Sequence, residues 1–83
     1  MNAKEMFEEL GYKFKTVVDK WKNTIIVYEN YEMSIEFDTH YNTCYLVHAT
    51  SYDEQEVAIA IGGIGGKFIL AITQQMKELG WIK

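Results

Sequence analysis

The sequence predicts an α+β domain in which a helix, an antiparallel meander of four strands and a second helix follow one another along 83 residues. Two observations carry this prediction. Apolar residues recur every three to four positions near both ends of the chain and every second position between them, which distinguishes helices from strands. The polar connections in the middle are short, as consecutive hairpins require. We expect both helices to pack on one face of the sheet.

The first helix is expected in residues 2–10, and the sequence marks both of its ends. Asn2 is a capping residue, and Glu5 occupies the capping-box position three residues later. Gly11 supplies a left-handed stop. The apolar face of this helix comprises Ala3, Met6, Phe7 and Leu10.

The second helix is expected in residues 67–79, and it ends as the first one does, with Glu-Leu-Gly and an aromatic residue. In the Schellman motif, the residue two positions past the helix end packs back on the last turn. We therefore expect Tyr12 and Trp81 each to cover the apolar stripe of its own helix. That stripe in the second helix comprises Ile69, Ile72, Met76 and Leu79.

Four segments with a period of two predict the strands: residues 13–18, 25–28, 33–38 and 44–48. From their alternation we predict which side chains face the helices. Together with the apolar helix residues, the predicted core contains Phe14, Ile25, Val27, Ile35, Phe37, Tyr45 and Val47, and Trp81 closes it.

Residues 51–66 are compatible with two interpretations. Val57, Ile59 and Ile61 alternate as in a fifth strand. By contrast, Ser51 or Asp53, followed three residues later by Glu54 or Glu56, is a capping-box pattern that opens a helix. Four interior glycines would cost such a helix about 4 kcal/mol relative to alanine. We favour a strand or extended segment, then a glycine turn at residues 62–66, with a two-helix hinge as the alternative.

Composition limits the class of protein. The chain is 48% hydrophobic and forms one domain rather than a disordered segment. One cysteine, no basic-then-apolar start and no apolar run of membrane-spanning length predict a cytoplasmic protein without a membrane span. A net charge of −4 and the absence of arginine disfavour sequence-specific nucleic-acid binding.

The glycine-rich segment does not match a nucleotide-binding motif. A phosphate-binding loop needs a glycine five positions before Gly66 and a hydroxyl residue after Lys67, but Ile61 and Phe68 stand there. A dinucleotide motif fails at the same Phe68. A weaker hypothesis remains, in which the backbone N–H groups of the turn bind a small anion or nucleotide. Its residues would be Gly63, Gly65, Gly66 and Lys67.

No pattern indicates catalysis, a metal or a cofactor. His40, Cys44 and His48 are evenly spaced, but residues four apart on a strand are separated by ~13 Å, too far to share a zinc ion or to form a nucleophile–base pair. The paired carboxylates of the second hairpin lie on an exposed strand phase, whereas a catalytic pair of carboxylates needs a cleft. We therefore predict a protein that is not an enzyme.

Charge is segregated along the chain. Residues 23–66 contain seven carboxylates and no lysine, which predicts a binding surface for a basic partner. The lysines of the first hairpin surround Trp21, an aromatic hot-spot candidate. Self-association stays open, since such a dipolar protein could pair with itself. The predicted partner-binding residues are Trp21, Glu29, Glu32, Glu36, Asp38, Asp53, Glu54 and Glu56.

The opening "AKEMFEELGY", the strand "IEFD" and the ending "AITQQMKELGW" resemble small uncharacterised proteins encoded by phages and prophages of low-GC Gram-positive bacteria. The resemblance implies a setting and no activity. With the acidic surface, it leads us to expect a non-enzymatic interaction module, for example a phage-encoded modulator or inhibitor of a host defence protein.

Overall fold

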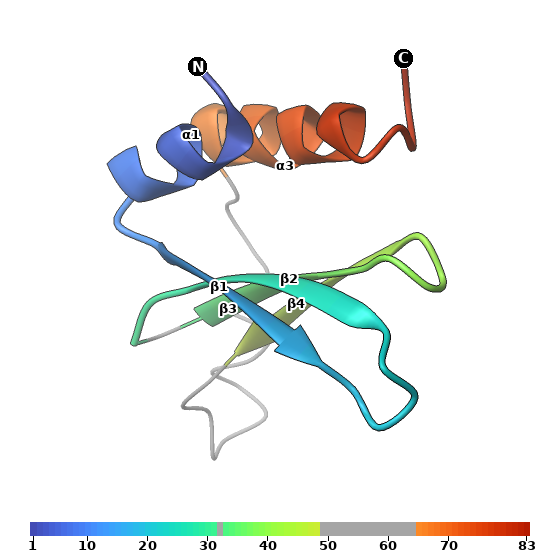
Figure 1. Ribbon diagram of the computed structural model, residues 1–83. Coiled ribbons are helices and arrows are strands. Elements are labelled where there is room, and N and C mark those ends of the chain that lie inside the picture. The colour runs from blue at the N-terminus through green and yellow to red at the C-terminus, as the bar shows by residue number, and fades with distance from the viewer. Residues whose placement is uncertain (32, 49–64) are drawn as a thin grey trace.

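The computed structural model describes residues 1–31, 33–48 and 65–83. These residues form helix α1 (Ala3–Glu9), strands β1 (Lys13–Val18), β2 (Thr24–Glu29), β3 (Met33–Asp38) and β4 (Thr43–His48), and helix α3 (Gly66–Glu78). The strands are antiparallel neighbours in the order β1-β2-β3-β4. Figure 1 shows the two helices side by side over one face of the sheet. The predicted α+β fold is confirmed.

Both ends of α1 are as predicted. The Asn2 side chain accepts the Glu5 N–H at 2.8 Å, and Glu5 Oε1 accepts the Asn2 N–H at 3.0 Å, which completes the capping box. At the other end Gly11 has a φ of 91°, and the Tyr12 N–H donates to the Phe7 carbonyl at 3.0 Å. This is the Schellman motif.

Helix α3 ends in the same way. Gly80 has a φ of 77°, and the Trp81 N–H donates to the Met76 carbonyl at 2.9 Å. Trp81 then packs on the core, with its ring centroid 6.0 Å from that of Phe37. The start of α3 lies within the predicted glycine turn: Gly65 is the N-cap and Gly66 the first helical residue. Residues 51–64, on which the choice between strand and helix depends, lie outside the described residues.

The core lies between the helices and one face of the sheet. Its largest fully buried side chains are Phe7, Tyr28, Ile35 and Phe37. The phase predicted for β3 is thus correct, but the phases predicted for β2 and β4 are wrong. Tyr28 and Ile26 face the helices instead of Ile25 and Val27, although Val27 is buried as predicted. Cys44 packs against the core instead of Tyr45 and Val47.

Cross-strand pairing explains this correction. Residues paired across an antiparallel sheet point to the same side. Tyr28 pairs with Ile35, and Phe37 pairs with Ile26 on one side and with Cys44 on the other. Because Ile35 and Phe37 face the core, their partners must do so too. β2 and β4 are apolar on both phases, so alternation within each strand could not decide its phase.

Two further core predictions are wrong. Phe14 lies on the helix-facing side, opposite Tyr28, but stays partly exposed, with Lys4 Nζ 5.4 Å from its ring centroid. Ile69 is exposed, because α3 buries the stripe that contains Phe68, Ala71 and Gln75.

One polar pair lies within this core. The Tyr28 hydroxyl donates to Gln75 Oε1 at 2.5 Å, and both side chains are buried. Burial raises the pKa of Tyr28 to about 12, and the carboxylates of Glu78 and Glu8 act in the same direction. The bond connects the centre of the sheet to the middle of α3.

We expect Tyr28→Phe to lower the free energy of unfolding by about 1–2 kcal/mol, because the buried Gln75 oxygen loses its donor. Denaturant unfolding measures this. Tyr31→Phe is the matched control: Tyr31 is 80% exposed, and its substitution should change the free energy by less than about 0.5 kcal/mol.

The pH dependence of this difference is also predicted. The pKa of Tyr28 is raised from 10.0 to about 12 in the folded state. The protonated hydroxyl therefore contributes fully to the free energy of unfolding below pH 10, and this contribution is lost as the pH rises to about 12. The stability gap between the wild type and Tyr28→Phe should therefore narrow over this interval. A gap that stays constant between these pH values would contradict the assignment.

Candidate functional site

The side of the sheet that faces away from the helices carries most of the predicted partner-binding residues that the structure describes. We call it the outer face. It is formed by the side chains of Lys13, Lys15, Val17, Ile25, Val27, Glu29, Ser34, Glu36, Asp38, Thr43, Tyr45 and Val47. Glu29, Glu36 and Asp38 thus share one surface. The outward phase of Glu36 and Asp38 is the one that the sequence predicts, whereas Glu29 joins them because β2 has the phase opposite to the predicted one.

The outer face is not uniformly acidic. Lys13 and Lys15 of β1 lie on it opposite Glu29 and Val27 of β2, and Lys15 Nζ lies 3.1 Å from Glu29 Oε1. The positive charges of the outer face therefore lie along β1, and the carboxylates of Glu36 and Asp38 lie along β3. The sequence places these charges in separate hairpins, whereas the sheet brings both signs onto one surface.

A shallow hollow of about 170 Å³ lies at the centre of this face. The apolar side chains of Val17, Ile25 and Val27 line it together with the charged groups of Lys15, Glu29 and Glu36 and the hydroxyl of Ser34. An ion pair of exposed side chains contributes little to stability. The ion pair on this face joins Lys15 to Glu29. Within the described residues, Glu36 has no ionic partner.

Trp21 lies at the end of the sheet where β1 turns into β2. Asp19 shapes this turn, since its Oδ1 accepts the N–H groups of Trp21 and Asn23, each at 2.9 Å. These hydrogen bonds, that of Asn23 first, lower the pKa of Asp19. The indole ring is 69% exposed, and Lys20 Nζ lies 4.4 Å from its centroid.

The turn between β3 and β4 lies beside Trp21. His40 and Tyr41 line a hollow of about 270 Å³ with Trp21 and Asn23. Tyr41 is 68% exposed. Asp38 connects this hollow to the outer face, because its Oδ1 accepts the His40 N–H at 2.9 Å and the Tyr41 N–H at 3.3 Å. Tyr41 is not among the residues that the sequence predicts, because its proximity to Trp21 depends on the pairing of four strands.

The remaining predicted site residues divide into two groups. Gly65, Gly66 and Lys67 lie at the start of α3, on the helix side of the sheet and away from the outer face. Lys67 lines a groove that Glu9 also lines, and a carboxylate there opposes anion binding. Outside the described residues lie Glu32, Asp53, Glu54, Glu56 and Gly63.

Among the described residues, no group of three or more histidines, cysteines or carboxylates is arranged to hold a metal ion. Cys44 pairs with Phe37 and packs against the core, and burial raises the pKa of its thiol to about 11. Neither helix of the described part of the chain is a candidate for a membrane span.

Comparisons with models of protein families, with curated proteins and with solved structures find no match for this chain.

The thiol of Cys44 should react slowly in the folded protein. A pKa raised from 9.0 to about 11 makes the thiolate about a hundred times scarcer near pH 8, and the thiolate is the nucleophile. We expect Ellman's reagent to modify the native chain roughly 100-fold more slowly than the chain unfolded in denaturant. Equal rates in both states would show that the thiol is not shielded by the core.

Proposed function

We propose that this chain is a non-enzymatic protein-binding module that docks through the outer face of its sheet and the adjoining Trp21 turn. The observation that carries the proposal is the central hollow, where apolar Val17 and Ile25, both partly exposed, lie beside the carboxylate of Glu36, which has no ionic partner among the described residues. Such a combination fits a long basic side chain, whose methylenes cover the apolar residues while its cationic head meets the carboxylate.

Trp21 and Tyr41 provide the second part of the proposed surface. Tryptophan and tyrosine are enriched among the residues that dominate binding energy at protein interfaces. Both rings are mostly exposed, and they flank one hollow next to Asp38. A partner that covers Trp21 and reaches Glu36 would bury an aromatic anchor with a charged contact at its side.

The proposed partner is a protein with a basic surface. Lys13 on the β1 side of the outer face would repel that surface, whereas Lys15 is paired with Glu29, so the partner would place its basic groups on the β3 side of the hollow, at Glu36. We extend the proposal to the setting that the sequence resemblance implies: a phage-encoded modulator of a host protein in the cytoplasm, such as a defence nuclease whose nucleic-acid site is basic.

The alternative hypothesis is a sensor of a small anion or nucleotide at Gly63, Gly65, Gly66 and Lys67. The glycine at the N-cap lacks a side chain that could cap α3, which leaves the first N–H groups of the helix available to a ligand. Glu9 in the same groove as Lys67 acts against an anionic ligand. On the outer face, by contrast, Lys15 is engaged by Glu29, and the carboxylate of Glu36 can meet a cation. We therefore favour protein binding.

The proposal predicts that Glu36→Lys and Trp21→Ala each weaken binding at least about tenfold. The partner is first captured from a host-cell extract on the immobilised wild-type chain, purified and titrated by calorimetry. Binding of the wild type should also weaken as salt rises from about 50 to about 500 mM, because exposed charges are screened.

Two variants serve as controls for this titration. Glu8→Lys makes the same charge change on the exposed side of α1, and Tyr31→Ala removes an exposed aromatic ring from the opposite end of the sheet. Both should bind as the wild type does. Wild-type affinity in Glu36→Lys and Trp21→Ala, with the protein folded by circular dichroism, would refute the proposed surface.

A further inference from the structure

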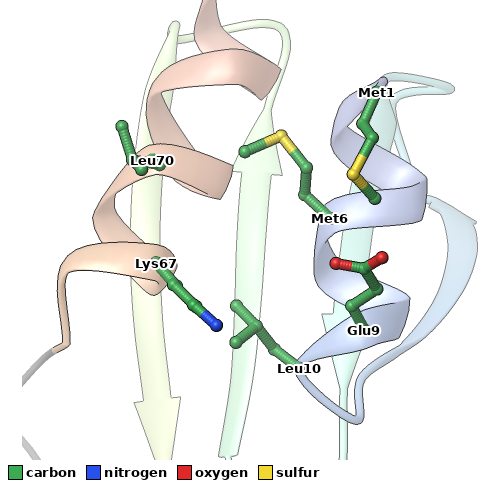
Figure 2. Close-up of a pocket in the computed structure, with 6 residues that line it drawn as sticks. All are labelled: Met1, Met6, Glu9, Leu10, Lys67 and Leu70. Atoms are coloured by element: carbon green, nitrogen blue, oxygen red, sulfur yellow. The ribbon is translucent and has the colours of Figure 1, made fainter.

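A groove separates the two helices on the side of the molecule opposite the outer face. It has a volume of about 470 Å³, and its apolar walls consist of Met1, Met6, Leu10 and Leu70. Figure 2 shows the Lys67 side chain extending from the start of α3 toward Leu10, while Glu9 projects from α1 on the other wall.

The groove combines apolar side chains with one charge of each sign. Leu70 is 60% exposed and Met1 is exposed as well, so apolar side chains lie at the surface. Within the described residues, the structure pairs neither Glu9 nor Lys67 with an opposite charge. The groove thus presents an apolar centre flanked by one carboxylate and one ammonium group.

We propose that this groove is the interface of a symmetric dimer, occupied by a second copy of the chain. In a two-fold interface each residue i meets residue j of the other copy, and j meets i. Glu9 of each copy would then meet Lys67 of the other, which gives two equivalent ion pairs around the apolar centre. Each exposed Leu70 would enter the groove of the opposite copy.

The opposite charges of Glu9 and Lys67 favour a second copy of the chain over other ligands of the groove. An anionic ligand would be attracted by Lys67 and repelled by Glu9, and a basic peptide would meet the reverse. A second copy satisfies both charges at once. The contact would be small, so we expect a weak dimer with Kd on the order of micromolar to a hundred micromolar.

The dimer is independent of the proposed function, since the outer face lies on the other side of the sheet from the helices. Both outer faces would stay accessible in the dimer. Glu36→Lys should therefore leave dimerisation unchanged, and loss of the dimer should leave the affinity of one outer face unchanged. Failure of either proposal can thus be recognised separately.

A charge-exchange experiment tests the interface by sedimentation equilibrium. Lys67→Glu gives each groove two carboxylates, and Glu9→Lys gives it two ammonium groups. Each variant alone should dimerise at least about tenfold more weakly than the wild type, because like charges then meet across the two-fold axis. An equimolar mixture of the two should form heterodimers with near wild-type affinity.

Two additional variants complete the design. Leu70→Asp should abolish the dimer. Because Leu70 is mostly exposed, the thermal unfolding temperature of this variant should stay close to that of the wild type. Lys22→Glu, a matched charge reversal in the exposed turn between β1 and β2, should dimerise normally. The proposal is overturned if the wild type is monomeric at ~1 mM, where a dimer of this affinity would predominate. It is equally overturned if the mixture of charge variants stays monomeric.

Discussion

The contact on which the rest of the structure depends is the one that Tyr28 makes with both helices. Its ring stacks on Phe7 of α1 with centroids 4.0 Å apart, and its hydroxyl donates to Gln75 of α3. Aromatic rings bury more area than other side chains, and a chain of this size has one modest core. Phe37 and Phe68 pack edge-on against Phe7, so the core is an aromatic cluster centred on one stacked pair.

A second contact, between the start of α1 and the end of α3, joins the two helices directly. α1 and α3 are antiparallel, because the N–H of Ala3 at the start of α1 donates to the Glu78 carboxylate at the end of α3, at 2.7 Å. A carboxylate at a helix N-terminus is favourable, since the first N–H groups have no partner within the helix. At the opposite end of the pair, Leu10 and Lys67 face each other across the groove. A charged hydrogen bond thus joins the helices at one end of the pair, and the apolar groove lies between them from Met1 to Leu10.

The helix layer and the outer face of the sheet present two different kinds of surface. The helix layer presents an apolar groove with one charge of each sign, and the outer face presents carboxylates along β3 beside an apolar centre. Because a sheet one layer thick separates them, a second copy and a partner protein could bind at the same time. A dimer with two outer faces would then bind two sites of one partner assembly with higher avidity than a monomer.

The sequence by itself determined the order of elements, their approximate bounds and both helix ends. These features depend on local chemistry: the Asn2–Glu5 capping box, the left-handed Gly11 and Gly80, and the period of the apolar residues. Glu36 and Asp38 could likewise be assigned to an outward surface, because the alternation of β3 is unambiguous.

Only the tertiary structure decided the phase of β2 and β4, the ion pair of Lys15 with Glu29 and the position of Tyr41 beside Trp21. Strands that are apolar on both phases give no internal signal, so the core-facing residues of β3 set the phase of their neighbours through cross-strand pairing. The groove between the helices has the same origin. One of its walls comes from the start of the chain and the other from near its end, and only the packing of α1 on α3 brings them onto one surface.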